Sequence, residues 1–409
     1  MKIAILAPFN PSSVREFFVN NKDVIDINPN ASAVNNLVVG LLKAGEEVIV
    51  LTLNPLCRKD KILKGKGIIV YLIGNKPLFK LLTYVPRLSN ECRKINTCLQ
   101  KIINQIDIIH AHWAYEYANA CLPYTQFKPV ICTFRDWPYA IISNLSKTPL
   151  FFYYIKRLLW IQRIKMCNRV INNQNIQLIA NSDYTYNILE KAVGSNDRIN
   201  LIYNSIEDDN ILKKPLQPQT NATFVSIASS LDDGRKNIIS LVKAFQIVNK
   251  KYSESKLMLI GPYHKDRELY KYVKDYNINN VFFCGPKKRN EVLSIIDNSL
   301  CLVHPSKEES FGNTIIESMA RCKVVIGGKD SGAVPYVLRH GKCGCLCDVN
   351  DYEEMASAML KVIEDDVYRI SLIHSATDTL MEYYANSVCI RRHIDLYTRE
   401  SQSYIKKNI

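Results

Sequence analysis

Two carboxylates, Glu309 and Glu317, lie close to the point where an apolar run gives way to a helical pattern. The run at residues 300–303 is typical of a short buried strand, and a loop leads from it to a helix expected over residues 313–321. Glu309 falls in the loop, and Glu317 about one turn inside the helix. Carboxylates accept hydrogen bonds from hydroxyl groups, and such charge-assisted bonds are strong. The pair therefore suggests a partner that is rich in hydroxyls.

The start of this expected helix has the features of an anion site. Gly312 allows a ligand to approach the backbone closely, and the N–H groups of Gly312, Asn313 and Thr314 should point out of the first turn. Unpaired donors and the helix dipole both favour negative charge at that position. With the two carboxylates on either side, the residues predict a site for a sugar joined to a phosphate.

The surrounding motif is similar to that of a known family. Pro305-Ser306, Glu309 and Phe311-Gly312 form the pattern PS-x-x-E-x-F-G, and a glycine-rich turn follows at residues 327–332. This resembles glycosyltransferase family 4, the retaining transferases with the GT-B fold. The resemblance implies that Glu309 lies by the donor sugar, that Glu317 holds the ribose, and that the amides of residues 312–314 bind the diphosphate. Ser310 and Phe311, inside the motif, are also expected to contact the donor.

Two cations precede a second helix, expected over residues 238–250. In the family, a lysine just before this helix and an arginine a few residues upstream neutralise the donor diphosphate. Lys236 matches the lysine, whereas the upstream position is Ser229 or Ser230, so Arg235 is expected to supply the second charge. The alternative for both cations is a solvated loop. With these charges in place the resemblance implies no catalytic metal, and Asp-x-Asp does not occur in the chain.

Further strand ends are expected to contribute to donor binding. Gly261 follows one apolar run, and Gly285-Pro286-Lys287 follows the next. In relatives the second of these ends lines the pocket for the nucleotide base. Asn204, after the last strand expected in the first half, is expected at the edge of a cleft.

The first half offers its own candidates. His110 and His112 end a strand pattern, where open parallel sheets place their ligands. His112 is expected to face the cleft, the alternative being an imidazole satisfied within the fold. Arg135 stands where many family members have a histidine that contacts the donor sugar, and a guanidinium can pair with a phosphate or an acidic acceptor. The family's glycine-rich loop after the first strand is also missing, since no glycine precedes Gly40.

The chain of 409 residues is long enough for two domains of ordinary size. Strand-like and helix-like segments alternate, which predicts α/β domains with parallel sheets. The resemblance implies a GT-B fold of two Rossmann-like, doubly wound domains facing across a cleft. We expect an acceptor domain over residues 1–206, a donor domain over residues 207–385, and a C-terminal helix at 386–409 that crosses back to the first domain. In the first half strands are expected at 2–7, 47–53, 67–73, 106–111, 129–134, 177–180 and 199–202.

The net charge of +14 is unevenly placed. Residues 1–205 hold 25 Lys+Arg and 13 Asp+Glu, hence +12, and the remainder holds 28 and 26, hence +2. Residues 140–182 contain no acidic residue, and bases such as Lys147 and Arg157 alternate there with Phe151, Phe152 and Trp160. Such a segment suits an interfacial helix on an anionic membrane, and residues 77–103 are similar. The alternative is an ordinary domain helix with a solvated basic edge. No nucleic-acid motif is present.

The 13 cysteines show no framework spacing, which fits a reducing cytosol. Cys343, Cys345 and Cys347 alternate along a strand and are expected as core thiols rather than zinc ligands. The N-terminal apolar run is too short for a signal peptide, and no window is long enough to span a bilayer.

We therefore expect a cytoplasmic hexosyltransferase, peripheral on the inner face of the cytoplasmic membrane. It would move sugar from a UDP- or GDP-linked donor to a glycan or lipid-linked acceptor, in capsule, lipopolysaccharide or related polysaccharide biosynthesis. The alternatives are a GT-B nucleotide-sugar epimerase and a non-catalytic nucleotide-sugar binding subunit.

Overall fold

The computed structural model describes residues 1–18, 24–27, 31–76, 88–143, 145, 150–214 and 222–408, with the backbone alone at residues 150–152, 407 and 408. Residues 28–30, residues 77–87, Lys147 and the linker residues 215–221 lie outside this part of the chain. Two compact units are present: unit 1 comprises Met1–Ser205 and Asn386–Ile409, and unit 2 comprises Ile206–Ala385.

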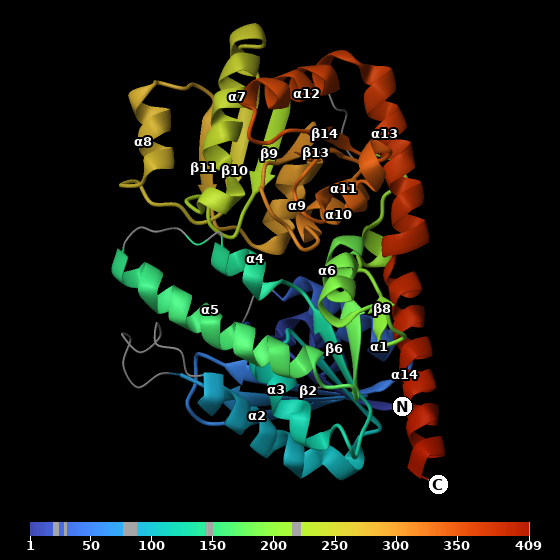
Figure 1. The fold of residues 1–409 in the computed structure, drawn as a ribbon. Coiled ribbons are helices and arrows are strands. Elements are labelled where there is room, and N and C mark those ends of the chain that lie inside the picture. Colours follow the sequence, from blue (N-terminus) through green and yellow to red (C-terminus); the bar gives the residue numbers. More distant parts are fainter. Residues whose placement is uncertain are drawn as a thin grey trace. The chain divides into compact units, whose positions relative to one another are not determined.

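The described strands of unit 1 form an eight-stranded sheet in the order β3-β4-β2-β1-β5-β6-β7-β8 (Figure 1). All neighbours are parallel except the edge pair β3–β4. The strands are β1 Lys2–Leu6, β2 Glu47–Asn54, β3 Lys61–Gly65, β4 Ile68–Gly74, β5 Ile108–His112, β6 Val130–Phe134, β7 Ile176–Ala180 and β8 Ile199–Leu201. The helices of unit 1 are α1 Ser32–Lys43, α2 Leu88–Ile102, α3 Glu116–Cys121, α4 Pro138–Ser143, α5 Leu150–Ile171, α6 Asp183–Val193 and α14 Asn386–Asn408.

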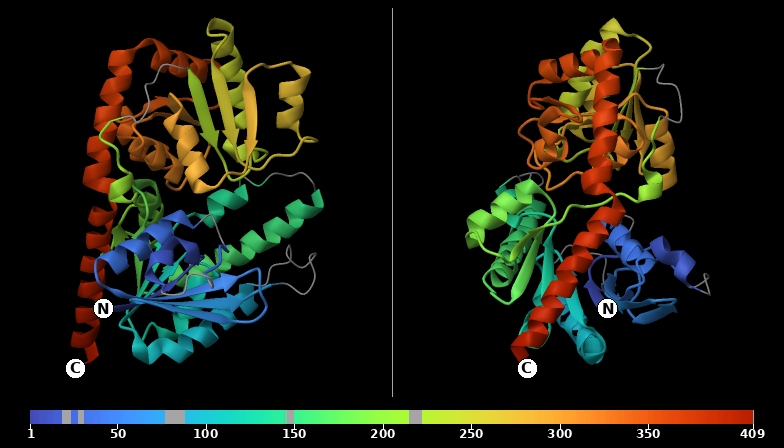
Figure 2. Two further views of the ribbon diagram at one scale, coloured as in Figure 1. Left: turned by 180° about the vertical axis from the view of Figure 1, so that it is seen from behind. Right: turned by 90° about the vertical axis from the view of Figure 1, so that its right-hand side faces the viewer.

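Alternate residues of the central strands build two separate cores, one on each face of this sheet. Ala4 and Leu6 of β1 pack with residues from α2, α3 and α5, whereas Ile3 and Ile5 pack with residues from α1 and α14. Because successive strand residues point to opposite faces, a strand buried on both sides must be apolar throughout. Figure 2 shows α14 lying along unit 1. The expected doubly wound α/β class is confirmed here.

The sequence patterns missed β3, the antiparallel edge strand of this sheet. Its sequence KILKG carries lysines at both exposed ends of the run, and only Leu63 is buried. Lysine is common on edge strands because its charge discourages pairing with another chain. The same residues break the apolar run on which the expectations relied.

The described strands of unit 2 form a fully parallel six-stranded sheet in the order β11-β10-β9-β12-β13-β14. The strand order therefore reverses between β9 and β12, and ligands bind at such switch points, outside the carboxyl ends of the strands. The strands are β9 Thr223–Ile227, β10 Lys256–Ile260, β11 Val281–Gly285, β12 Cys301–His304, β13 Val324–Gly328 and β14 Cys345–Cys347. The helices are α7 Ile238–Lys251, α8 Glu268–Asp275, α9 Arg289–Asp297, α10 Asn313–Ala320, α11 Val334–Val337, α12 Tyr352–Glu364 and α13 Asp366–Thr379.

The three alternating cysteines of unit 2 are buried thiols. Cys345 and Cys347 belong to the hydrophobic core of this unit, and Cys343 is 1% exposed. Burial raises the pKa of each of these thiols, which keeps them protonated. They therefore pack as small apolar side chains, as expected.

Candidate active site

The start of α10 depends on a glycine. Gly312 adopts a left-handed conformation, with φ 89° and ψ 68°, and a β-carbon there would lie 2.7 Å from the Ile315 side chain. Only glycine reaches this conformation at little cost. It turns the loop after β12 into the helix, so that Asn313 and Thr314 form the first turn, as the sequence predicts. A helix start of this kind offers N–H groups and a positive dipole end to an anion.

Glu309 lies in the loop before this helix and is held as a carboxylate. Its Oε1 atom accepts hydrogen bonds from Lys236 Nζ, in an ion pair, and from His304 Nε2 at 3.2 Å. The three side chains are 15%, 14% and 5% exposed, respectively. Burial alone would raise the pKa of Glu309, but the Lys236 ammonium and the His304 ring hold it well below its usual value. The group is therefore an ionised acceptor beside a cation.

Backbone contacts bring together the loops that carry these groups. The Lys307 N–H donates to the Arg235 carbonyl at 2.9 Å, and this bond ties the loop after β12 to the loop after β9. The Ala333 N–H donates to the Glu309 carbonyl at 2.8 Å and adds the loop after β13. Gly332, with φ 61°, lies so close that a β-carbon there would collide with the same carbonyl oxygen. The position of Glu309 thus depends on loops from β9, β12 and β13.

His304, the last residue of β12, is a site residue that the sequence patterns missed. The residue as a whole is 4% exposed. Its Nδ1 atom lies 3.4 Å from Thr314 Oγ1, and its Nε2 atom bonds Glu309. Its ring therefore joins the carboxylate to the first turn of α10. The available signal was its place directly after the apolar run, at the carboxyl end of a parallel strand.

The two predicted cations of the β9 loop have different surroundings. Lys236 meets Glu309, whereas Arg235 pairs with Asp233 of its own turn at 3.3 Å. Both residues belong to the short 3-10 helix Gly234–Lys236, and Asn237 then enters α7 with a left-handed φ of 55°. The described contacts therefore bring Lys236 to the carboxylate but not Arg235.

Glu317 lies inside α10, with Arg289 NH1 at 3.4 Å from its Oε1. Burial raises the pKa of Glu317 in spite of the opposing charge of Arg289. Arg289 begins α9, after the N-cap Lys288 that follows the strand end at Gly285, Pro286 and Lys287. Lys287 itself pairs with Glu291 at 3.5 Å.

The remaining predicted donor contacts lie near the same sheet edge or beside the motif. The Gly261 N–H donates to the Gly285 carbonyl at 3.1 Å, joining the ends of β10 and β11. Phe311 is 1% exposed and meets Tyr384 edge to face, at 5.7 Å between ring centres. Phe311 thus supports the loop from inside the unit, while Ser310 is partly exposed.

Unit 1 gathers a second group of candidates at the ends of β5, β6 and β8. Arg135 donates to His112 Nδ1 from Nε at 3.2 Å and from NH2 at 3.0 Å, and its NH1 donates to Asn204 Oδ1 at 2.5 Å. His112 is fully buried, and burial, followed by His110 and Arg135, lowers its pKa well below the usual value. The structure therefore brings together His112, Arg135 and Asn204, which are far apart in sequence.

His110 is a satisfied core residue. Its ring nitrogens lie 2.6 Å from Tyr397 Oη and 2.7 Å from Thr133 Oγ1. Within the described parts of the chain, no group of three His, Cys, Asp or Glu side chains is placed to hold a metal ion.

Two family models match the chain. "Glycosyltransferase Family 4" matches residues 31–210, and "Glycosyl transferases group 1" matches residues 207–379. The N-acetyl-α-D-glucosaminyl L-malate synthase of Bacillus anthracis is 26% identical over 52% of this chain and 56% of its own length. The capsular polysaccharide biosynthesis glycosyltransferase CapM of Staphylococcus aureus is 26% identical over 44% of this chain and 47% of its own. The chain thus spans about half the length of these curated relatives.

Solved structures share the fold over nearly the whole chain. Sucrose-phosphate synthase of Thermosynechococcus elongatus has a TM-score of 0.75 at 17% identity, covering 98% of this chain and 99% of that one. Anabaena HepE in complex with UDP has a TM-score of 0.66 at 16% identity, covering 98% and 100%. Because the two family models between them extend from residue 31 to residue 379, the chain belongs to glycosyltransferase family 4, and its fold is GT-B.

Proposed function

We propose that this glycosyltransferase is a retaining hexosyltransferase. Its donor would be a nucleotide diphosphate sugar, and its acceptor a glycan or lipid-linked glycan of a surface polysaccharide. The observation that carries the proposal is the ion pair of Lys236 with Glu309, supported by His304 beside the glycine-capped start of α10. The names of CapM and of a poly(glycerol-phosphate) α-glucosyltransferase of Bacillus subtilis support a polymer acceptor. The UDP-glucose complex of HepE supports a nucleotide-sugar donor.

In the proposed reaction the bond between the sugar and the diphosphate breaks, and a bond from the sugar to an acceptor hydroxyl oxygen forms on the same face. The acceptor proton passes to the leaving diphosphate oxygen. An ammonium has three N–H donors, so Lys236 can bond the diphosphate while it keeps Glu309. With the amides of the α10 start, it would offset the leaving group's charge without a metal. Glu309 would accept from sugar hydroxyls, and Glu317 from the ribose.

The test is transfer by the full chain. Purified protein is incubated with UDP- and GDP-sugars and lipid-linked acceptors, and nucleotide release, product mass and product anomer are measured. We expect Lys236→Met to lower kcat by about 10²–10³, the usual effect of removing one preorganised donor. Lys271→Met, an exposed lysine of α8, is the matched control and should keep full activity. Free isomerised sugar, or donor binding without turnover across the panel, would contradict the proposal.

We also propose that unit 1 binds the inner face of the cytoplasmic membrane through α5. Tyr154, Leu158 and Ile161 are 56%, 60% and 37% exposed and recur at helical spacing, and Lys156 and Arg157 are exposed between them. An exposed apolar stripe beside basic side chains suits an anionic lipid surface. None of the helices in the described part of the chain has an apolar stretch of the length that a bilayer demands.

Vesicle sedimentation tests this second element. We expect Leu158→Asp to reduce binding to vesicles of anionic lipid, whereas Phe127→Asp, at an apolar side chain outside α5 that is 65% exposed, should not. An equal loss of vesicle binding in both variants, or equal binding of the parent protein to neutral and anionic vesicles, would contradict a role for α5.

A further inference from the structure

The chain passes between the two units twice, and the two crossings are joined on the unit 2 side. The first crossing lies between Ser205 and Ile206, and the second between Ala385 and Asn386. The Ile206 N–H donates to the Tyr384 carbonyl at 2.9 Å, and Ile206 and Ala385 form a parallel β-bridge. The backbone of Tyr384 is therefore bonded to the first crossing and directly precedes the second.

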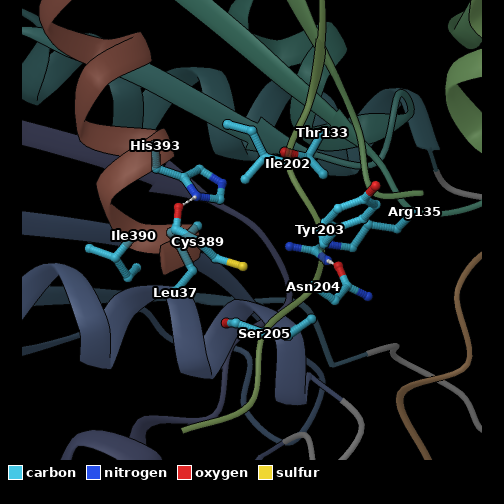
Figure 3. A pocket seen from close by; sticks show the side chains of 11 residues that line it. Leu37, Thr133, Arg135, Ile202, Tyr203, Asn204, Ser205, Cys389, Ile390 and His393 are labelled. Atoms are coloured by element: carbon cyan, nitrogen blue, oxygen red, sulfur yellow. Dashed lines mark hydrogen bonds between the residues drawn. The ribbon is translucent and has the colours of Figure 1, made fainter. Parts of the chain in front are cut away.

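Buried polar side chains join the two crossings on the unit 1 side as well. The Ser205 hydroxyl donates to Asn386 Oδ1 at 2.8 Å, and Asn386 Nδ2 donates to the Asn36 carbonyl at 3.2 Å. Asn36 Nδ2 donates to the Ser205 carbonyl at 2.7 Å and closes the network. Figure 3 shows that Ser205 lines one pocket together with Cys389 and Ile390, from the first turns of α14. In each unit the two crossings are thus held together by contacts within that unit.

The side chain of Tyr384 supports the loop that carries Glu309 by two routes. Its ring meets the Phe311 ring edge to face, at 5.7 Å between ring centres and 88° between the planes. Its hydroxyl donates to the Val337 carbonyl at 3.4 Å, at the end of α11. At the other end of α11, the N–H of the N-cap Ala333 donates to the Glu309 carbonyl. One side chain therefore touches the donor loop directly and also through α11.

Tyr384 is packed tightly on its other sides. It is fully buried and ends a π-helical turn, Leu380–Tyr384, in which Met381 is 53% exposed. Such turns are rare and often mark functional positions. The Arg339 guanidinium lies 3.6 Å from the centre of the Tyr383 ring and 5.7 Å from that of the Tyr384 ring. Because a close-packed interior has little free volume, a displacement of Phe311 is passed on to Tyr384 rather than absorbed.

We infer that Tyr384 is a positioning residue of the donor site, which acts through Phe311 on Glu309 and links the donor loop to both crossings of the chain. The inference rests on the proposed function, which assigns this loop to the donor sugar and diphosphate. Coupling between two sites is reciprocal, so a ligand that orders the donor loop should also stabilise the crossings. The reporter is the Ile206 N–H, because it bonds the Tyr384 carbonyl and belongs to a residue that is 2% exposed.

Hydrogen exchange of the full chain tests this link without turnover. A ligand at 100 times its Kd suppresses an opening that is coupled to its binding by about 100-fold. We expect UDP or GDP at this concentration to slow exchange of the Ile206 amide by up to about 100-fold. The Asp365 amide, which bonds the Lys361 carbonyl at the end of α12, should exchange at an unchanged rate. An Ile206 amide that exchanges equally fast with and without bound nucleotide would overturn the inference.

Variants of Tyr384 separate positioning from a general loss of stability. Tyr384→Leu should lower kcat by up to about 100-fold, the cost of misplacing a catalytic group by about 1 Å. In this variant, nucleotide at 100 times the variant's own Kd should no longer slow exchange at Ile206. Tyr384→Phe keeps the ring and should restore both transfer and the slowing of exchange.

Phe245→Leu is the matched control, because it removes another fully buried ring from the core of unit 2, on α7. It should lower stability as Tyr384→Leu does but leave kcat and the slowing of exchange at Ile206 unchanged. An equal fall in kcat in Phe245→Leu and Tyr384→Leu would overturn the inference. Slowing of exchange at Ile206 without any transfer would contradict the proposed function alone, and transfer that Tyr384→Leu leaves unchanged would contradict the inference alone.

Discussion

The effects of the Lys236–Glu309 ion pair on protein stability and on glycosyl transfer can be measured separately. Both side chains are about 15% exposed, so removal of one leaves the other charged, largely buried and without its partner. Breaking a buried pair in this way costs about 3–5 kcal/mol, and we expect about 3 kcal/mol here because the pair is not fully buried. For a unit of this size that corresponds to a fall in Tm of roughly 6–12 °C.

The double variant is expected to behave differently. Replacing both partners by neutral side chains of similar volume is often neutral for stability, so Lys236→Met with Glu309→Gln should lie within about 1 kcal/mol of the parent protein. Each single variant, and the double, should nevertheless lose glycosyl transfer, because the charges that act on the donor are gone. In the double variant we therefore expect stability to be restored and glycosyl transfer to remain lost.

The assay is a double-mutant cycle by urea unfolding, followed by circular dichroism, with nucleotide release measured on the same samples. Lys329→Met is the matched control, since Lys329 and Glu354 form an exposed pair in the same unit, at 46% and 40% exposure. Exposed pairs contribute less than about 1 kcal/mol, so the free energy of unfolding of this control should hardly change. Additive losses in the double variant would show that the two residues do not form the pair, and would refute the reasoning.

Other predictions address the support of the site and the core of unit 1. His304→Phe removes one of the two groups that lower the pKa of Glu309, so the acid limb of the kcat/KM profile should move to higher pH; an unchanged limb would contradict it. Gly332→Ala should reduce both stability and transfer, because its β-carbon collides with the Glu309 backbone, whereas Gly341→Ala, also at positive φ but with space around it, should reduce stability alone. Burial lowers the pKa of His393 to about 4, so the unfolded chain takes up the proton at higher pH than the folded protein does. About 3 kcal/mol of stability should therefore be lost as the pH falls from about 6.5 to 4. In acid denaturation, His393→Phe should make the loss of stability with falling pH less steep.

Local patterns were enough to predict most of the elements. The apolar run before residue 304, the glycine at 312 and the periodicity after it predict β12, the loop and α10 within a residue. Each of these signals is local, because a strand, a turn and a helix start depend on neighbouring residues. The helix at 366–379 was missed, since it follows α12 directly at Asp365 without a glycine or proline between them.

Which side chains meet depends on contacts that spacing does not encode. Arg235 and Lys236 are adjacent and alike in charge, yet Lys236 pairs with Glu309 whereas Arg235 pairs with Asp233 of its own turn. The place of His304 at the end of an apolar strand could have marked it as a residue of the site, but not that its ring joins Glu309 to Thr314. The first contact joins loops that are far apart in the chain, and the second depends on how one loop folds back on the end of its own strand.

Sheet topology explains why residues that are far apart in the sequence converge in each unit. In unit 2, Lys236 follows β9 and Glu309 follows β12, the strands on either side of the switch point, so their loops must leave the sheet side by side. There the Lys236 ammonium pairs with the Glu309 carboxylate, and the diphosphate of the proposed donor would share Lys236 with Glu309. In unit 1, residues at the ends of β5, β6 and β8 meet in a similar way, since Arg135 donates hydrogen bonds to His112 and to Asn204. In both units the order of the strands in the sheet, rather than the spacing of residues in the sequence, decides which loop residues meet.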